Sequence, residues 1–414
     1  RIAIIEVGGT VGDIESQPFL ESIRQFQHEV GKENAILIHV TLIPYLKASQ
    51  EMKTKPTQAS VKELQGMGIQ PDIIVCRSEY PLDQHIKDKI ALFCNVPNNR
   101  VLQNLDVEYL YEAPLAMERE KLADVVLESL RLENRKPDLS EWIQMVNDLR
   151  NPESVVNIAM VGKYTQLHDA YLSVAEALQH AGYQCGTYVK IQWIDSEKLT
   201  EQTVEEELGS LQGIIVPGGF GNRGIEGMIL AAGYAREKGI PYLGICLGMQ
   251  IAVMEFARHV AGITDANSGE FDELCANKVI DYMPGQNDDI DKGGTLRLGS
   301  YPCEIQKGTG MEKCYGTNHI NERHRHRYEF NNAYRDSLQQ AGLTLSGLSP
   351  DGRLVEAVEL SGHPFFIGVQ YHPEFKSRPN KSHPLFQGFV NAACEHVLKT
   401  GNYSEQVEAF TAKT

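Results

Sequence analysis

The chain has 414 residues, more than one hydrophobic core usually organises, so we expect two or three domains. Hydrophobic residues make up 42% and charged residues 23% of the sequence, an average globular composition that excludes a disordered or fibrous chain. The formal charge of −16 argues against a general nucleic-acid-binding protein, and no apolar run is as long as a membrane span. The eight cysteines are scattered without a C-x-x-C pair, which favours a reducing, cytoplasmic setting.

The first 130 residues alternate short apolar runs with helical patterns. Buried strands are predicted at residues 2–7, 35–43 and 72–76, and helices at residues 18–30, 60–67, 84–93 and 118–130. This alternation is typical of a parallel α/β sheet. The chain opens on Arg1 and runs directly into the first of these strands, from which we expect a further segment upstream.

A change of character after residue 131 predicts a domain boundary. Residues 132–154 hold two prolines and many polar residues, and predict a linker with one helix at residues 142–149. A second α/β unit is predicted to follow, with strands at residues 155–161, 187–194, 213–216, 240–245 and 365–369, and helices at residues 168–181, 224–238 and from 247 to about 258. Partly antiparallel strands are predicted within residues 275–359, with a polar loop at residues 281–294. The predicted divisions are therefore residues 1–131, a linker at 132–154, a second domain at 155–400 and a tail at 401–414.

The most informative segment is Gly244-Ile-Cys246-Leu-Gly248, where an apolar strand ends and a helical pattern begins. Small residues two positions on either side of a nucleophile allow a tight strand-to-helix turn, which holds the side chain at the edge of a sheet. The helix N-terminus favours a thiolate, and the amide after the cysteine can bind an oxyanion. Most cysteines in a cytoplasmic protein are simply buried, but the glycine frame makes Cys246 the candidate nucleophile. The other seven cysteines are interpreted as structural.

The segment Gln370-Tyr-His372-Pro-Glu374 supplies a base directly after a predicted strand. His372 can take the thiol proton, and Glu374 can fix the orientation and charge of the imidazole. By itself such a segment is more often a turn, but together with the cysteine turn it indicates a Cys-His-Glu triad. The segment Pro217-Gly-Gly219-Phe-Gly221 follows another predicted strand, and its glycines allow the backbone to approach a small ligand and donate to an oxyanion.

These three motifs resemble those of the class I glutamine amidotransferases. The resemblance implies that Cys246 forms a thioester from glutamine and releases ammonia, with His372 and Glu374 completing the triad. It also implies a set of glutamine-binding residues, namely Gly219, Leu247, Gly248, Met249, Gln250, Glu270 and Arg327. A carboxylate and a guanidinium suit the ammonium and carboxylate groups of a zwitterionic amino acid.

Five further motifs resemble the CTP synthase family and, with the triad motifs, run from residue 6 to residue 374 in that family's order. They are Glu6-Val-Gly-Gly-Thr-Val-Gly-Asp13-Ile14-Glu15, Lys53-Thr54-Lys55-Pro56-Thr57-Gln58, Lys89-Ile-Ala-Leu-Phe-Cys94, Gly293-Gly-Thr-Leu-Arg297-Leu-Gly299 and Glu322-Arg-His-Arg-His-Arg327-Tyr-Glu329. The family implies a glutamine-hydrolysing ligase that forms a C–N bond. ATP phosphorylates the 4-oxygen of UTP, and ammonia from glutamine then displaces phosphate to give CTP.

The resemblance also assigns ligands to residues. UTP, or CTP as the feedback inhibitor, is expected at Asp13, Ile14, Glu15, Lys53, Thr54, Lys55, Pro56, Thr57, Gln58 and Lys89. Asp106 and Val107 match the segment that contacts the adenine of ATP, and Glu6, at the end of the first predicted strand, matches a Mg²⁺ ligand. Arg297 is the expected contact for the activator GTP. The family further implies a cytoplasmic homotetramer that binds neither nucleic acid nor a membrane.

The expected fold is α/β: a class I glutamine amidotransferase domain with a mixed sheet and flanking helices, after the later part of a P-loop-type parallel α/β synthetase domain. The 414 residues contain no G-x-x-x-x-G-K-[ST] loop for ATP. We therefore expect that the front of the synthetase domain is missing and that this chain by itself has glutaminase activity only. The alternatives are a stand-alone or degenerate glutaminase, or a non-catalytic role in assembly. His319, His324 and His326 are not expected to bind zinc, because arginines alternate with them.

Overall fold

A computed structural model describes residues 2–165, 167–282 and 296–400. The chain divides into two compact units, Arg1–Val146 and Asn147–Thr414. The predicted tail at residues 401–414 and most of the predicted loop at residues 281–294 lie outside the described residues. Within the described part of the chain, no helix has both the length and the apolar character that a membrane crossing requires.

The first unit is built on a parallel sheet of three strands in the order β1-β4-β5. Its strands are β1 (Ile38–Leu42), β4 (Ile73–Ser78) and β5 (Val101–Leu105), and a short ladder pairs β2 (Tyr45–Leu46) with β3 (Glu51–Met52). Its helices are α1 (Gln17–Val30), α2 (Lys55–Gly66), α3 (Gln84–Cys94), α4 (Ala113–Arg119) and α5 (Leu122–Ser129), and α6 (Ser140–Arg150) spans the division between the units. The main core packs Val61 of α2 and Ile90 of α3 against Ile74 and Cys76 of β4.

Three predictions for this unit are wrong. Residues 2–7 form no strand and Ile4 is 94% exposed, because an apolar segment becomes a strand only where a neighbouring strand supplies hydrogen bonds, and no described strand pairs with it. The helix predicted at residues 118–130 is two helices, α4 and α5, which Lys121 separates with a φ of +61°. The helix predicted from residue 60 begins at Lys55, where Pro56 suits the first helical turn. Strand β5 is absent from the predictions.

The second unit contains a sheet of nine strands in the order β13-β12-β15-β16-β17-β9-β8-β6-β7. Its strands are β6 (Ser154–Gly162), β7 (Thr187–Asp195), β8 (Gly213–Val216), β9 (Tyr242–Ile245), β12 (Arg297–Ile305), β13 (His319–His326), β15 (Leu343–Leu348), β16 (Val355–Leu360) and β17 (Phe366–Val369). A smaller sheet joins β10 (Asn267–Ser268), β11 (Lys278–Tyr282) and β14 (Tyr328–Phe330). The strands from β17 to β7 pair in parallel and those from β13 to β17 pair antiparallel, so the predicted mixed sheet is confirmed.

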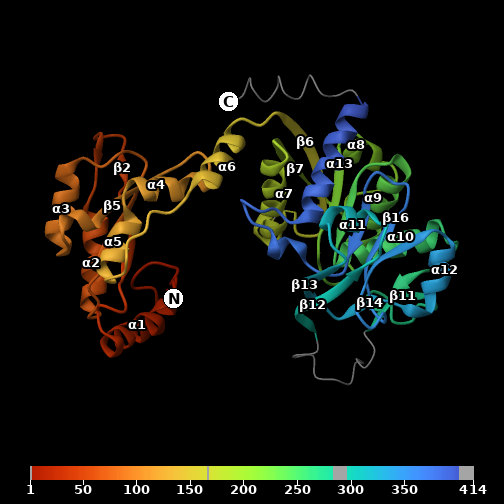
Figure 1. Ribbon diagram of the computed structural model, residues 1–414, viewed down its shortest axis with the longest axis horizontal. Coiled ribbons are helices and arrows are strands. Elements are labelled where there is room, and N and C mark those ends of the chain that lie inside the picture. The colour runs from red at the N-terminus through yellow and green to blue at the C-terminus, as the bar shows by residue number, and fades with distance from the viewer. Residues whose placement is uncertain (1, 166, 283–295, 401–414) are drawn as a thin grey trace. The chain divides into compact units, whose positions relative to one another are not determined.

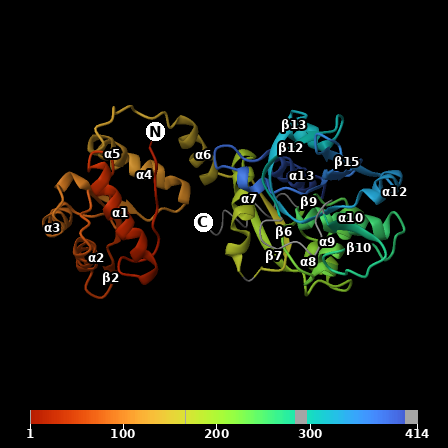
Figure 2. The same ribbon diagram turned by 90° about the horizontal axis from the view of Figure 1, so that it is seen from below.

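Helices cover both faces of this large sheet (Figures 1 and 2). They are α7 (Leu172–Gln184), α8 (Val204–Leu208), α9 (Ile225–Lys238), α10 (Leu247–His259), α11 (Gly310–Tyr315), α12 (Arg335–Gln340) and α13 (Pro384–Thr400). Ala159 and Val161 of β6 belong to the core that contains α9 and α10, whereas Ile158 and Met160 belong to the core that contains α7 and α13. A strand that is apolar on both faces is typical of a parallel sheet buried between helix layers.

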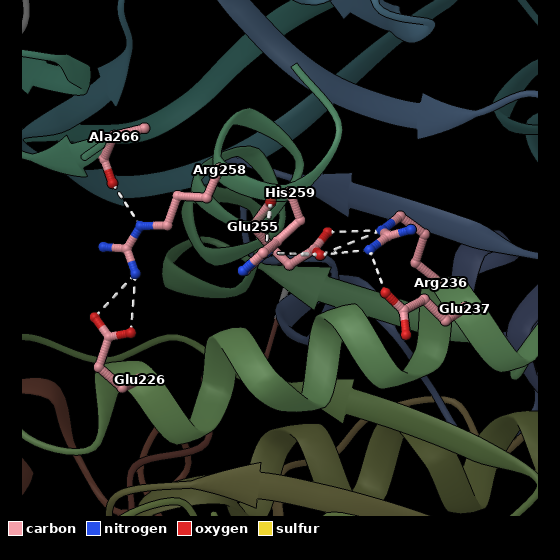
Figure 3. A network of polar contacts seen from close by, with 7 residues as sticks. All are labelled: Glu226, Arg236, Glu237, Glu255, Arg258, His259 and Ala266. Atoms are coloured by element: carbon pink, nitrogen blue, oxygen red, sulfur yellow. Dashed lines mark hydrogen bonds and ion pairs between the residues drawn. The ribbon is translucent and has the colours of Figure 1, made fainter. Parts of the chain in front are cut away.

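A buried ion pair joins α9 to α10 (Figure 3). Glu255 of α10 is 1% exposed, and its carboxylate accepts hydrogen bonds of 2.9 to 3.2 Å from Arg236 of α9. Arg258, one turn further along α10, donates to the carbonyl of Ala266 at 2.7 Å and pairs with Glu226 at 2.9 Å. These contacts fix α10, the helix that follows Cys246, against its neighbour.

Candidate active site

Cys246 lies at the junction of β9 and α10 and has a φ of +52°. Residues other than glycine rarely adopt a positive φ, so surrounding contacts must hold the turn. The N–H of Cys246 donates to the carbonyl of Val369 in β17 at 2.7 Å. A Cβ on Gly244 would lie 2.5 Å from the carbonyl of Gly248, and a Cβ on Gly248 would lie 2.1 Å from the carbonyl oxygen of Val216. Close backbone packing is therefore the reason for the two glycines around Cys246.

His372 follows β17 and lies beside Cys246. Its Nδ1 is 2.8 Å from Oε1 of Glu374, and its backbone N–H donates to the carbonyl of Arg323 at 2.8 Å. A Cβ added to Gly218 would lie 2.9 Å from Cε1 of His372 and 3.6 Å from Cβ of Cys246. The imidazole and the cysteine therefore flank the same point, and the structure brings together the three residues of the predicted triad.

The charges around His372 favour its protonated form. Burial opposes that form, but the electrostatic interactions of the imidazole with Cys246 and Glu374 outweigh it and raise the pKa of His372 to about 10. Nδ1 is engaged with the carboxylate, and Nε2 has no well-formed hydrogen bond within the described part of the chain. Nε2 is therefore the nitrogen that can exchange a proton with the thiol.

The glycine loop at residues 217–221 is held by a buried lysine to which sequence analysis assigns no role. Lys163 directly follows β6 and is 6% exposed, and its Nζ donates to the carbonyls of Phe220, at 3.1 Å, and Gly221. Burial lowers the pKa of Lys163 to about 8, although Glu270 acts in the opposite direction. The N–H of Gly221 donates to Oε1 of Glu270 at 2.8 Å, so two charged side chains set the path of this loop. In the sequence, a lysine directly after a continuous apolar strand is the signal that could have indicated a role for Lys163.

The candidate glutamine-binding residues lie in four segments. Leu247, Gly248, Met249 and Gln250 form the first turn of α10, and a Cβ on Gly219 would lie 3.2 Å from Cδ2 of Leu247. Glu270 reaches the same glycine loop through Gly221. Arg327 lies between β13 and β14, next to Tyr328, whose carbonyl accepts a hydrogen bond from Gln250 at 3.0 Å. The side chain of Gln250 also donates a hydrogen bond to Gln370, a residue to which the sequence motifs assign no role.

Two family models and many curated relatives match the chain. The model described as "CTP synthase N-terminus" matches residues 1–132, and the one described as "Glutamine amidotransferase class-I" matches residues 166–392. The CTP synthase of Ruminiclostridium cellulolyticum is 59% identical over 96% of this chain and 74% of its own length. The chain belongs to the CTP synthase family. The CTP synthase of Pelotomaculum thermopropionicum is 56% identical over 97% of this chain and 75% of its own length.

A solved structure supports the fold of the second unit. The glutaminase domain of Trypanosoma brucei CTPS with bound acivicin is 41% identical, with a TM-score of 0.55, and covers 58% of this chain and 94% of that one. The predicted α/β fold class, with a class I glutamine amidotransferase domain, is confirmed, and so is the resemblance to CTP synthase.

The predicted nucleotide loop of the CTP synthase family is partly helical in this chain. Lys53 and Thr54 precede α2, whereas Lys55, Pro56, Thr57 and Gln58 form its first turn. Thr57 is 1% exposed, and its hydroxyl donates to Thr41 Oγ1 at 3.0 Å, which anchors α2 to β1. Lys53 pairs with the carboxylate of Glu51. The helical turn reflects Pro56, whose fixed φ suits the start of a helix.

The other candidate nucleotide contacts lie on surface segments of the first unit. Asp13 accepts a hydrogen bond from the N–H of Thr10 at 2.8 Å and precedes a 3₁₀ turn at Ile14–Ser16, which contains Glu15. Lys89 is exposed on α3. Asp106, next to Val107, forms an ion pair of 3.1 Å with Arg77. Their roles in binding UTP, CTP or ATP stay predictions.

The expected Mg²⁺ ligand, Glu6, is exposed and lies in the segment that forms no strand, so its predicted place at a strand end is wrong. No group of three His, Cys, Asp or Glu residues in the described part of the chain could hold a metal ion. Mg²⁺ is usually bound by one or two carboxylates together with substrate phosphates. The described residues do not by themselves form a metal site.

Arg297, the expected GTP contact, has internal partners. Its side chain is 9% exposed, its Nη1 is 2.6 Å from Oε1 of Glu356, and its guanidinium lies 4.5 Å from the ring centre of Tyr301. His324 and His326 are buried nearby, and their rings are joined at 3.1 Å between Nδ1 and Nε2. Burial and the charge of Arg297 lower the pKa of His326 to about 3, which keeps this imidazole neutral.

Proposed function

We propose that the chain hydrolyses glutamine at Cys246, His372 and Glu374, which is the half of the CTP synthase reaction that supplies ammonia for the amination of UTP to CTP. The observation that carries the proposal is the meeting of Cys246 and His372 beside Gly218, in a chain whose relatives are named CTP synthase. A thiol, an imidazole and a carboxylate in this order are the groups that acyl transfer from an amide requires.

The first half of the reaction forms the thioester. His372 takes the thiol proton at Nε2, and the thiolate attacks the carboxamide carbon of glutamine. The carbonyl oxygen becomes an oxyanion, which we assign to the N–H groups of Leu247 and Gly219. Leu247 opens α10, and the loop that contains Gly219 approaches Leu247. The C–N bond then breaks, and His372 returns its proton to the leaving nitrogen, which departs as ammonia.

The second half releases glutamate. A water molecule gives a proton to His372 and attacks the thioester carbon. The C–S bond breaks, and the sulfur recovers a proton from the imidazole. Glu374 stabilises the charged imidazole in both halves through its contact of 2.8 Å with Nδ1.

Substrate binding is proposed for the residues around the turn. Glu270 is assigned to the ammonium group of glutamine and Arg327 to its carboxylate, because opposite charges pair with the two ends of a zwitterion. Leu247, Gly248, Met249 and Gln250, with Gly219, would line the side chain. Lys163 supports this function by holding the carbonyls of the glycine loop.

For the amination step we propose the ligands that the family implies. Lys53, Lys55 and Lys89 would supply cations for the phosphates of UTP or CTP, and Asp106 and Val107 would contact ATP. Glu6 would be one ligand of a Mg²⁺ ion that neutralises phosphate charge. We also propose that GTP activates the protein and that the protein forms a homotetramer in the cytoplasm. The first domain is proposed to end at residue 131 and the second to begin at residue 155.

Two assays on the purified 414-residue chain test the proposal. We expect release of glutamate from glutamine, measured with glutamate dehydrogenase. CTP formation from UTP, ATP and free ammonia is measured separately by chromatography of the nucleotides. Absence of glutamate release would contradict the proposed triad, and CTP formation would contradict the expectation that this chain is a glutaminase only.

A further inference from the structure

Gln370 is a fully buried residue at the end of β17, next to the proposed triad. Its backbone N–H donates to the carbonyl of Glu356 in β16 at 2.9 Å. The preceding residue, Val369, accepts the N–H of Cys246 at 2.7 Å. The backbone on which Gln370 sits is therefore fixed to the same strand-to-helix turn that presents the nucleophile.

The side chain of Gln370 reaches the nucleophile itself. Its Nε2 lies 3.5 Å from Sγ of Cys246, a normal distance for an N–H group that donates to sulfur, and its Oε1 lies 3.3 Å from Nε2 of Gln250. A buried amide of this kind is costly unless its polar atoms find partners. Gln370 finds partners for its nitrogen and its oxygen within the active-site region.

The orientation of the Gln370 amide follows from a chain of hydrogen bonds with a fixed start. Nε2 of Gln250 lies 3.0 Å from the backbone carbonyl of Tyr328, which can only accept a hydrogen bond. That carbonyl requires the amino group of Gln250 at this position, and the same group faces Gln370. Gln370 must then present its oxygen to Gln250, which leaves its own amino group toward the sulfur of Cys246. Both amide orientations are thus determined by Tyr328.

We propose that Gln370 donates a hydrogen bond to the thiolate of Cys246 and so stabilises the nucleophile in its reactive form. This inference rests on the proposed role of Cys246. A hydrogen bond to a charged acceptor is stronger than one between neutral groups, so the contact favours the thiolate over the thiol. The amide exchanges no proton, and its role differs from that of His372, which takes the proton. The contact weakens once the sulfur becomes a neutral thioester, so it acts on formation of the nucleophile.

Two substitutions separate this role from simple packing. Gln370→Met keeps most of the volume and removes the donor, and Gln370→Glu keeps the acceptor for Gln250 but replaces the donor by an acid. The readout is the rate of alkylation of Cys246 by iodoacetamide as a function of pH, with the modified residue identified by mass spectrometry. Hydrogen bonds to charged groups predict that alkylation at pH 7 slows by about 10- to 100-fold in Gln370→Met. The midpoint of the pH profile should rise by about one to two units, and Gln370→Glu should show at least as large an effect.

Gln212→Met is the matched control. Gln212 is 2% exposed and forms hydrogen bonds at the start of β8, whereas Cys246 follows the end of the adjacent parallel strand β9. Its alkylation profile should match that of the unsubstituted chain. If either folded Gln370 variant keeps the unsubstituted profile, the proposal is overturned. The proposed function fails instead if Cys246 of the unsubstituted chain is not alkylated, or if excess glutamine does not slow its alkylation.

A measurement on the unsubstituted chain covers the case in which both variants fail to fold. With ¹⁵N-labelled glutamine, one side-chain amide proton of Gln370 should shift in the NMR spectrum when Cys246 is alkylated, because the thiolate acceptor is lost. The side-chain signal of Gln212 should stay in place. An unchanged Gln370 signal would overturn the proposal.

Discussion

The two units of the chain differ in how completely their apolar residues are covered. In the second unit β8 and β9 are buried along their whole length, and the sheet has a core on each face. In the first unit β1 alternates buried and exposed residues, and Val40 and Leu42 are 58% and 62% exposed. The triad candidates lie where packing fixes the backbone, and the nucleotide candidates lie on the less covered unit. The geometry of the structure therefore supports the triad candidates in the second unit, whereas the nucleotide candidates in the first unit rest on the family resemblance.

The sharpest test of this contrast removes the nucleophile. Cys246→Ala should lower glutamate release by at least about 10³-fold, because loss of a nucleophile removes the covalent route. The matched control is Cys94→Ala, which truncates a buried thiol of the first unit. This variant should be less stable to unfolding, but its folded form should release glutamate at a rate within about twofold of the unsubstituted chain. Glutamate release by Cys246→Ala at the unsubstituted rate would break the comparison.

A second test compares ion pairs. Glu255→Ala leaves Arg236 without its buried partner and should lower the free energy of unfolding by about 3–5 kcal/mol. In the first unit, Asp106→Asn removes a pair whose side chains are more than half exposed and should cost less than about 1 kcal/mol. Urea unfolding followed by circular dichroism measures both. Equal losses for the two variants would show that burial does not distinguish the units.

A third test uses pH. Burial raises the pKa of Glu329 to about 7, while Arg297 opposes the shift and Glu356 adds to it. Between pH 4.5 and about 7 the folded state therefore binds more protons than the unfolded state, and stability falls as the pH rises. Relative to Glu329→Gln, which cannot titrate, the unsubstituted chain should lose roughly 3 kcal/mol across this window. Parallel urea unfolding curves at pH 5 and pH 8 measure the difference; a constant difference would contradict a buried, protonated Glu329.

The sequence predicted most of the elements whose formation depends on local residue pattern. The turn around Cys246 is an example, since Gly244 and Gly248 mark a close backbone approach that only glycine permits. Residues 2–7 show the opposite case, because their apolar pattern fits a strand but a strand depends on a partner that local sequence does not reveal. The break at Lys121 likewise depends on a positive φ at a residue that usually continues a helix.

Side-chain contacts of the site were harder to predict than its motifs. Gln370 stands two residues before His372, yet its contact with Cys246 depends on Gln250 and Tyr328, which are distant in sequence. Lys163 acts on a loop more than 50 residues away through its long side chain. Motifs identify groups that react, whereas the residues that position them are found only after the strands are placed side by side.

The most direct test of the proposed glutaminase site is to label the chain with a chloroketone analogue of glutamine and map the label by mass spectrometry. We expect the label on Cys246, with the other seven cysteines unmodified at one equivalent of reagent, and protection by excess glutamine. Label on another cysteine, or label on Cys246 that glutamine does not prevent, would contradict the account.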